Sequence, residues 1–184
     1  MDSLLDKLFR FWRTQKVINH ILKGSIVCDI GCGLDVYFLN RIKRSIKKGV
    51  GLDQDLCDYT EGNLEFKNIK IDSNLPFPDD YFNAATMVAF LEHIESPEII
   101  TGEAFRILKK GGKLILTTPS PISKPILIFL AFLSLIDKRE ISSHKNYFWP
   151  KDIRKILSGA GFNKENVKIN FFEFFTNIVA VATK

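Results

Sequence analysis

The 184-residue sequence has few cysteines, no long apolar run and no internal repeat. Three cysteines are too few for a disulfide scaffold, and an odd number leaves at least one unpaired, which favours a reducing cytoplasm. The longest apolar run covers residues 125–136, well short of the roughly 20 residues that a membrane-spanning helix needs. Residues 1–23 mix apolar and charged side chains, so we expect no secretory signal there. With no Gly/Ser linker, the sequence predicts a single domain over residues 1–184.

Metal ligands at a useful spacing are also lacking. Cys28, Cys32 and Cys57 are too scattered for a zinc site, and no His/Cys cluster has metal-ligand spacing, so we expect no metal. The formal net charge of +5 permits contact with nucleic acid or anionic lipid but predicts neither. Apolar residues make up 46% and charged residues 26% of the chain, which excludes a disordered or collagen-like protein.

Apolar runs alternate with helical patterns along most of the chain. Such alternation is typical of βαβ crossovers and a largely parallel sheet. The last two apolar runs are separated by too few residues for a crossover helix, so they must form an antiparallel hairpin. We predict a doubly wound α/β fold with seven strands, mostly parallel, and one antiparallel strand in that C-terminal hairpin. The expected strands are 25–30, 49–53, 66–72, 83–91, 113–119, 166–174 and 177–183, and the expected helices include an amphipathic one within 1–23, then 36–46 and 97–110.

A glycine-rich turn follows the first predicted strand, in the sequence "VCDIGCGLD". Gly31 and Gly33 allow the backbone to approach a ligand closely and to adopt torsions that a side chain would forbid. A dinucleotide-binding G-x-G-x-x-G pattern would place a third glycine at position 36, where this chain has Val36. The missing glycine argues against pyrophosphate binding, and a tight turn without any ligand remains the alternative.

Acidic residues lie at or near the ends of three successive predicted strands. They are Asp29, Asp53 and Asp72, and Asp53 follows Gly31 at the spacing expected for an acid that binds ribose hydroxyls. Open α/β sheets bind ligands at this edge. Acids there suit a ligand with a ribose, amino groups and a positive charge, and they repel phosphates. A helix cap or a solvated turn is the alternative for any one of the three.

Several segments together resemble the class I S-adenosylmethionine-dependent methyltransferases of the small-molecule type (the type 11 methyltransferase family), over residues 13–183. The resemblance implies a Rossmann-like fold, S-adenosyl-L-methionine as cofactor and methyl transfer as the activity. The segments are "VCDIGCG", "GLD", "IDSNLPFPDDYFNAATMVAFLEHIESP", "ILKKGGKLILTTPSP" and "HKNYFWPKDIRKILSGAGF".

The resemblance also implies a set of cofactor contacts. They are Asp29 at the cofactor amino group, Gly31 and Gly33 under the methionine part with Cys32 between them, Asp53 with its neighbour Gln54 at the ribose, Asp72 and Ser73 at the adenine, and Val88 and Ala89 beside the sulfonium. The family usually has a third glycine where this chain has Asp35. Asp35 either points at the cofactor or places a favourable negative charge at a helix N-terminus, and we favour the second.

Two histidines are candidate general bases for the acceptor. His93 follows the fourth predicted strand, and His144 follows the apolar run 125–136. An unperturbed imidazole titrates near physiological pH and suits proton transfer. His93 has the alternative role of holding its loop by hydrogen bonds. Arg13 is a candidate clamp for the cofactor carboxylate, with a solvated or ion-paired side chain as the alternative.

Residues 120–148 form the acceptor-side insertion, or lid, in this interpretation. We expect residues 125–136 to be a helix that closes an apolar acceptor pocket, with Phe129 and Phe132 among its lining. Basic residues flank the run, so contact of residues 124–139 with a membrane surface is the competing expectation.

The function predicted from the sequence is methylation of a small acceptor, with residues 125–136 favouring a hydrophobic one. Nucleic-acid methylation is one alternative, but the chain has no aromatic-basic stacking segment, and "AFLE" stands where amino-directed enzymes carry an "NPPY"-like tetrapeptide. The other alternative is a non-catalytic regulator that binds the cofactor. Only the replacement of the family's third glycine by Asp35 supports it. The sequence does not determine the oligomeric state.

Overall fold

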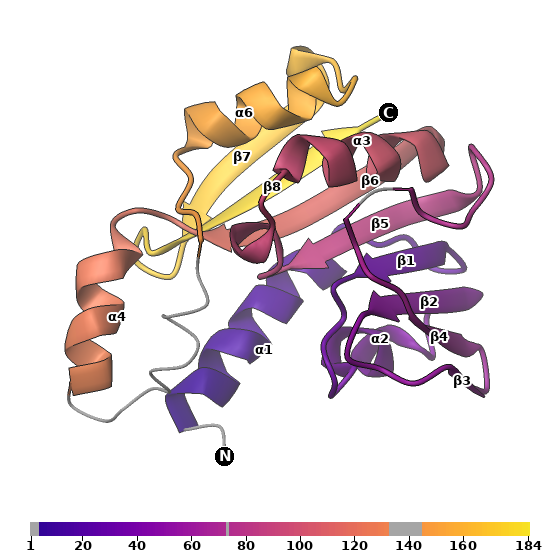
Figure 1. Ribbon diagram of the computed structural model, residues 1–184, viewed down its shortest axis with the longest axis horizontal. Helices are drawn as coiled ribbons and strands as arrows, with labels where there is room; N and C mark the ends of the chain where they lie inside the picture. Colours follow the sequence, from indigo (N-terminus) through magenta and orange to yellow (C-terminus); the bar gives the residue numbers. More distant parts are fainter. Residues whose placement is uncertain (1–3, 73, 133–144) are drawn as a thin grey trace.

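An eight-stranded sheet forms the centre of the computed structural model, which describes residues 4–72, 74–132 and 145–184 (Figure 1). The strand order is β3-β4-β2-β1-β5-β6-β8-β7. The strands are β1 (Ile26–Ile30), β2 (Lys48–Asp53), β3 (Tyr59–Glu61), β4 (Leu64–Asn68), β5 (Phe82–Val88), β6 (Leu108–Pro119), β7 (Val167–Phe172) and β8 (Asn177–Thr183). The helices are α1 (Leu4–Ile18), α2 (Tyr37–Ile42), α3 (Pro97–Ile107), α4 (Ser123–Phe132) and α6 (Pro150–Gly159), with 3-10 turns η1 (Leu91–His93) and η2 (Lys164–Asn166).

The predicted fold class is confirmed, with one more strand than the sequence indicated. Strands β4, β2, β1, β5 and β6 pair in parallel, and β8 pairs antiparallel with both β6 and β7, as the hairpin prediction requires. The additional strand, β3, pairs antiparallel with β4 at the edge of the sheet. Its three residues are all exposed, so no apolar pattern marks them in the sequence.

Several predicted boundaries were wrong. The strand expected over residues 66–72 is β4, which ends at Asn68, so Asp72 lies beyond the strand. The helix expected over 36–46 is the shorter α2, which begins only after the left-handed residue Val36. The helix expected to run to residue 110 ends at Ile107, because β6 begins directly at Leu108.

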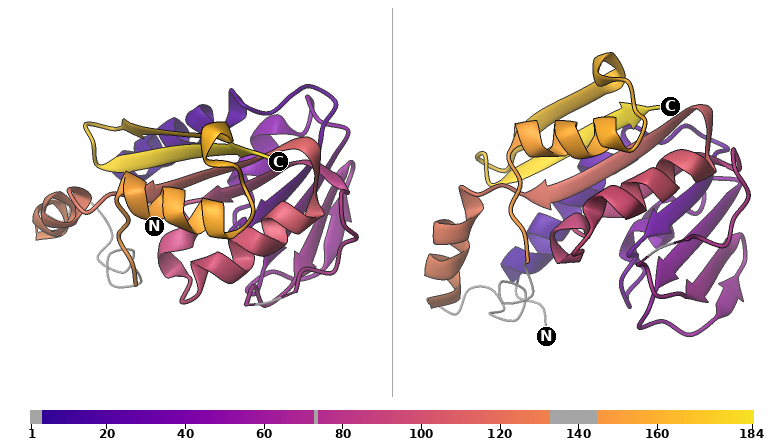
Figure 2. Two further views of the ribbon diagram at one scale, coloured as in Figure 1. Left: turned by 90° about the horizontal axis from the view of Figure 1, so that it is seen from above. Right: turned by 45° about the horizontal axis from the view of Figure 1, so that its top comes forward.

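Helices cover both faces of the sheet, and each face has its own core (Figure 2). Apolar side chains of α3 and α6 pack on one face, and those of α1 and α2 pack on the other. Strands buried on both faces have continuous apolar sequences, which is why β1 and β2 were visible in the sequence. Across the described ranges, no helix has the length and apolar content needed to cross a membrane.

The direction in which the chain adds strands reverses beside β1. The chain proceeds from β1 to β2 and β4 on one side, and then returns to add β5 and β6 on the other. Loops that leave neighbouring parallel strands in opposite directions leave a crevice at their carboxyl ends, where open α/β sheets bind ligands. The fold therefore places the glycine-rich turn after β1, the acid at the end of β2 and the loop after β5 around one crevice.

The close packing around Gly51, beneath this crevice, can be tested by substitution. A Cβ atom added to Gly51 on β2 would lie 2.7 Å from the Phe66 ring and 2.9 Å from Cys32 Sγ. We expect Gly51→Ala to lower the free energy of unfolding by about 1–3 kcal/mol, since overpacking forces side chains from their preferred rotamers. Gly102→Ala on α3 is the matched control, because a Cβ atom there would have no other atom within 4 Å. This change should raise the free energy of unfolding by up to about 1 kcal/mol. Urea unfolding of both variants measures the difference, and a Gly51→Ala variant as stable as the wild type would contradict this packing.

Candidate active site

The turn after β1 adopts the backbone conformation for which its glycines are needed. Gly31 and Gly33 have φ angles of 74° and 69°, in the left-handed region that side chains disfavour. The N–H groups of Gly31 and Cys32 donate to the carbonyl of Leu52 at 2.9 and 3.1 Å. The turn is thereby bound to the last residues of β2.

Asp53, at the end of β2, holds the same turn through its side chain. Its Oδ2 accepts a hydrogen bond from the Gly33 N–H at 3.0 Å, and its Oδ1 accepts one from the Asp55 N–H at 3.1 Å. A carboxylate oxygen has two lone-pair sites, so each oxygen can still accept a bond from a ligand hydroxyl. Asp53 is therefore held by the backbone while it remains able to bind a ligand.

A cavity of about 570 Å³ lies beside Asp53, within the range of about 300–1,000 Å³ typical of small-molecule sites. Four of the residues predicted from the sequence line it, from three separate loops: Asp53, Gln54, Asp72 and His93. Its remaining lining consists of Asp55, Lys70, Ile71, Phe90, Ile94, Glu95, Ser96, Ile100 and Lys145.

Asp72 reaches the cavity from a loop rather than from a strand end. It lies four residues beyond the end of β4 and makes an ion pair with Lys70 at 2.7 Å. Lys145 and Glu95 form a second pair at 2.8 Å across the same cavity. The sequence analysis missed both lysines. Lys145 reaches the cavity only because its segment contacts Glu95, which lies 50 residues away along the chain.

The ring of Phe90 was also missed. A Cβ atom at Gly31 would lie 2.0 Å from this ring, so Phe90 packs directly on the glycine-rich turn and also lines the cavity. Gly31 is thus required by two features of this structure, its left-handed backbone and the close approach of Phe90. The only sequence signal for Phe90 was its place near the end of the predicted fourth strand, residues 83–91.

Asp29 lies beneath the turn, almost completely buried, and does not line the cavity. Thr86 on the neighbouring strand β5 donates its hydroxyl to Asp29 Oδ1 at 2.6 Å. Burial raises the pKa of Asp29 to about 7; the Thr86 bond acts against this rise, and the negative charges of Asp53 and Asp35 add to it. Asp29 is therefore a buried acid that titrates near neutral pH.

The other predicted residues are distributed around the cavity or fall outside the described ranges. Gly31, Cys32, Gly33, Val88 and Ala89 do not line the cavity itself. Ala89 has a φ of 52°, and its N–H donates to the Thr117 carbonyl at 3.0 Å, which fixes the loop after β5. Burial raises the pKa of Cys32 well above its ordinary value. Ser73 and His144 lie outside the described residues.

Asp35 does not line the cavity. It pairs with Arg10 on α1, and Arg10 also lies over the Tyr37 ring of α2, 5.0 Å from its centroid. Asp35 makes no helix-capping hydrogen bond, because the residue at the N-cap of α2 is Val36. Asp35 directly precedes this N-cap, so its favoured role as a negative charge at the helix N-terminus stays a prediction, and its ion pair with Arg10 also anchors α1 beside the glycine-rich turn.

The acceptor-side segment is helical where predicted, over the part that is described. α4 stands away from the sheet in both views (Figures 1 and 2), and Phe129 on it is 60% exposed. Phe129 is therefore not covered by the described part of the chain, and its place in the lining of an acceptor pocket stays a prediction. The side chain of Phe132 and residues 133–144 lie outside the described part, so the remaining expectations for the lid and for membrane contact stay predictions.

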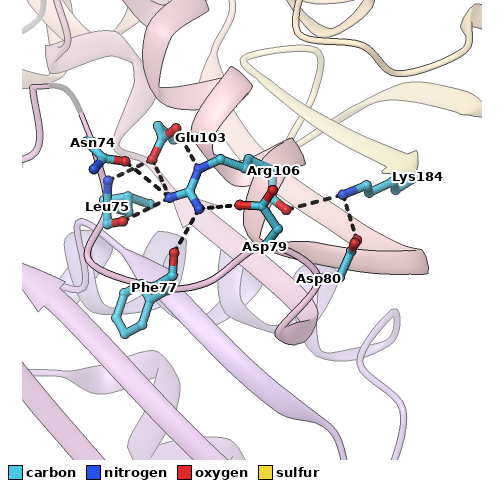
Figure 3. A network of polar contacts seen from close by, with 8 residues as sticks. All are labelled: Asn74, Leu75, Phe77, Asp79, Asp80, Glu103, Arg106 and Lys184. Carbon is cyan, nitrogen blue, oxygen red and sulfur yellow. Dashed lines mark hydrogen bonds and ion pairs between the residues drawn. The ribbon is translucent and has the colours of Figure 1, made fainter.

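Arg106 on α3 fastens the loop that follows Asp72 (Figure 3). Its guanidinium donates to the carbonyls of Leu75 and Phe77 at 2.9 and 2.8 Å. It also pairs with Asp79 and Glu103 at 2.7 Å each, and these carboxylates raise the pKa of Arg106. Glu103 in turn accepts the Leu75 N–H at 2.7 Å. The network holds residues 74–79 in place, and with them one end of the segment that contains Asp72.

Fold and site together define a Rossmann-like α/β protein with a cavity at the topological switch point of its sheet. A family model described as "Methyltransferase domain" matches residues 4–167. The chain therefore belongs to the methyltransferase-domain family.

Similar proteins agree with this assignment. The chain is 30% identical over 139 residues to the ubiquinone/menaquinone biosynthesis C-methyltransferase UbiE of Neisseria meningitidis, covering 68% of this chain and 56% of that protein. It is 23% identical to the ubiquinone biosynthesis O-methyltransferase of Psychrobacter arcticus, covering 83% and 65%. The structure of an S-adenosylmethionine-dependent methyltransferase from Archaeoglobus fulgidus superposes with a TM-score of 0.76 at 22% identity, over 97% of this chain and 94% of that one. The chain thus spans little more than half the length of the first of these relatives, and the structural likeness shows the fold.

The buried acid under the turn predicts a pH effect on stability. Because the pKa of Asp29 is raised to about 7, the folded chain holds a proton between pH 4 and 7 that the unfolded chain releases near its ordinary pKa of about 3.9. The contribution of Asp29 to the free energy of unfolding is therefore full below about pH 4 and is lost as the pH rises to about 7. We expect Asp29→Asn, which keeps the acceptor for Thr86, to be more stable than the wild type at pH 8 by at least about 2 °C in Tm. Thermal unfolding of both proteins from pH 4 to 8 checks this, and parallel curves would show that Asp29 does not titrate there.

The Arg106 network predicts a local effect on the loop that it holds. Arg106→Lys keeps the charge but cannot reach the same set of acceptors, so we expect a loss of about 1–3 kcal/mol in the free energy of unfolding. Amide exchange at Leu75, whose N–H is bonded to Glu103, should become faster. The control is Arg44→Lys on an exposed position, which should change neither quantity. Unchanged Leu75 exchange in Arg106→Lys would mean that the loop is held by other contacts.

Proposed function

We propose that this chain is an S-adenosylmethionine-dependent methyltransferase that acts on a small molecule. The observation that carries the proposal is the cavity at the switch point, into which Asp53 and Asp72 project from two loops beside the glycine-rich turn. The family match and the names of the two curated relatives, which refer to quinone biosynthesis, support it.

The lining of the cavity fits this cofactor. S-adenosylmethionine supplies a methyl group on an already activated sulfonium. Its ribose hydroxyls need acceptors, which the spare lone pairs of Asp53 provide, and its adenine amino group needs an acceptor that Asp72 can supply. Gln54 lies next to Asp53 on the same wall. Four acids and two lysines line the cavity, and this excess of negative charge suits a cationic ligand better than a pyrophosphate.

The remaining residues have proposed roles around the sulfonium end. Asp29 lies under the turn, where a carboxylate would attract the cofactor's amino group. Gly31, Cys32 and Gly33 form the floor of the methionine part, and the loop of Val88 and Ala89 borders the sulfonium. His93 lines the same cavity as the two acids, which favours contact with the cofactor over proton removal from the acceptor.

The structure weakens the alternative of a non-catalytic binder. Its only support was Asp35, and this residue pairs with Arg10 and does not line the cavity. The relatives' names include both a C- and an O-methyltransferase, so they support a small-molecule acceptor without selecting the methylated atom.

Calorimetric titration tests the proposal. We expect binding of S-adenosylmethionine and S-adenosylhomocysteine, and none of NAD. Asp53→Ala removes the hydroxyl acceptors and should weaken S-adenosylhomocysteine binding about tenfold or more.

Two controls sharpen this experiment. Asp53→Asn keeps one carbonyl acceptor and should have an intermediate affinity, whereas Glu165→Ala changes an exposed acid that does not line the cavity and should have little effect. Tight binding of NAD, or an unchanged affinity in a folded Asp53→Ala variant, would refute the assignment.

A further inference from the structure

The turn between β7 and β8 lies at the same edge of the sheet as the cofactor cavity. Because β8 is antiparallel to β6, Asn177 at the start of β8 lies opposite Pro119 at the end of β6. Ser120 binds the turn twice, through its N–H to the Thr176 carbonyl at 2.8 Å and its hydroxyl to the Phe175 carbonyl at 2.6 Å. Figure 1 shows this turn, in yellow, beside the chain that leads from β6 into α4.

The backbone of this turn is strained. Glu173, Phe174 and Phe175 have φ angles of 50°, 54° and 70°, and none of them is glycine. Left-handed residues with side chains are costly, and a succession of three persists only where the surroundings enforce it; such strain concentrates at functional sites. Here the strained backbone leaves Phe174 and Phe175 exposed, at 87% and 62%, while it directs the Glu173 carboxylate inward.

The Glu173 carboxylate is only half satisfied. Its Oε2 accepts a hydrogen bond from the Asn177 amide at 2.6 Å. Its Oε1 is shielded from solvent and accepts no hydrogen bond from the described part of the chain, where it is the one buried side-chain oxygen or nitrogen in this state. An unsatisfied buried acceptor is costly, so its retention calls for a partner that the described part of the chain does not supply.

The charges around Glu173 indicate what kind of partner fits. Arg13 on α1 attracts both Glu173 and the buried Glu92, and Thr118 on β6 donates to Glu92 at 3.1 Å. His93 attracts Glu92 as well, and burial raises the pKa of Glu173 to about 7 in spite of Arg13. The unsatisfied atom is an acceptor, so a hydroxyl or amino group would supply the missing donor, whereas an ionised carboxylate would bring only further acceptors.

We propose that Glu173 Oε1 binds the polar group of the methyl acceptor, and that the acceptor is a hydrogen-bond donor, a hydroxyl or an amine, on an apolar body. The exposed rings of Phe174 and Phe175 border the same turn and supply apolar contacts for that body. Glu173 is thus a specificity-determining residue that favours neutral donors over carboxylates. This proposal rests on the proposed function, since it concerns the second substrate of the same enzyme.

Three probes with one apolar body test the proposal by equilibrium binding: 2-naphthol, its methyl ether 2-methoxynaphthalene, and 2-naphthoate. At about pH 8.5, above the raised pKa of Glu173, we expect the wild-type protein to bind 2-naphthol about tenfold or more tightly than the ether, because a hydrogen bond to a charged group is worth at least a factor of ten. It should bind 2-naphthoate more weakly than 2-naphthol. In Glu173→Gln, which keeps the shape of the side chain, the preference for 2-naphthol over the ether should fall to about threefold or less.

Two further variants make the result decisive. Glu173→Ala should abolish the preference for 2-naphthol, and Glu165→Gln, a matched change at an exposed glutamate on η2, should leave it intact. The proposal is overturned if the wild type does not bind 2-naphthol, binds it no better than the ether, or keeps the same preference after Glu173→Gln.

A separate titration of the same variants with S-adenosylhomocysteine distinguishes this proposal from the proposed function. We expect unchanged affinity in Glu173→Gln, because Glu173 does not line the cofactor cavity. Normal S-adenosylhomocysteine binding with no effect of Glu173 on the probes would reject the acceptor site alone. Absence of S-adenosylhomocysteine binding would reject the proposed function, whatever the probes show.

Discussion

The hydrogen bond from the Gly33 N–H to the Asp53 carboxylate joins the two strand ends on which the candidate site depends. β1 and β2 are parallel and in register, with Ile30 opposite Leu52, so the turn after one strand faces the acid at the end of the other. This hydrogen bond holds the Asp53 side chain in place, and the same carboxylate stabilises the left-handed backbone at Gly33. The wall of the cavity formed by Gln54 and Asp55 begins at this point.

Two buried carboxyl groups and one half-buried one, that of Glu173, give the carboxyl edge of the sheet its electrostatic character. Asp29, Glu92 and Glu173 lie on β1, η1 and the β7–β8 turn, and burial raises the pKa of each. Helix α1 supplies cations to this edge: Arg10 pairs with Asp35, and Arg13 attracts Glu92 and Glu173. The first helix is therefore an electrostatic part of the site as well as a cover for one face of the sheet.

The sequence predicted the fold wherever a buried element has a recognisable pattern of apolar residues. Strands β1 and β2 are apolar throughout because both of their faces are covered, and the short interval between β7 and β8 permits only a hairpin. β3 was missed because its three residues are exposed and are held only by pairing with β4. The end of β4 was misplaced because the apolar pattern continues to Ile71, beyond the last paired residue.

For the site, the sequence determined which functional side chains are present, and the tertiary structure decided in which direction they point. Residue type and spacing after a glycine-rich turn were enough to select Asp53, because the distance along a βαβ unit is nearly constant. The packing of Phe90 on Gly31, the pairing of Asp35 with Arg10 and the inward turn of Glu173 had no such signal. Phe90 and Arg10 meet partners 59 and 25 residues away, and Glu173 turns inward through a backbone conformation that its residue type disfavours. Side-chain direction at these positions is set by contacts that exist only in the folded chain, so local sequence could name the residues but not their roles.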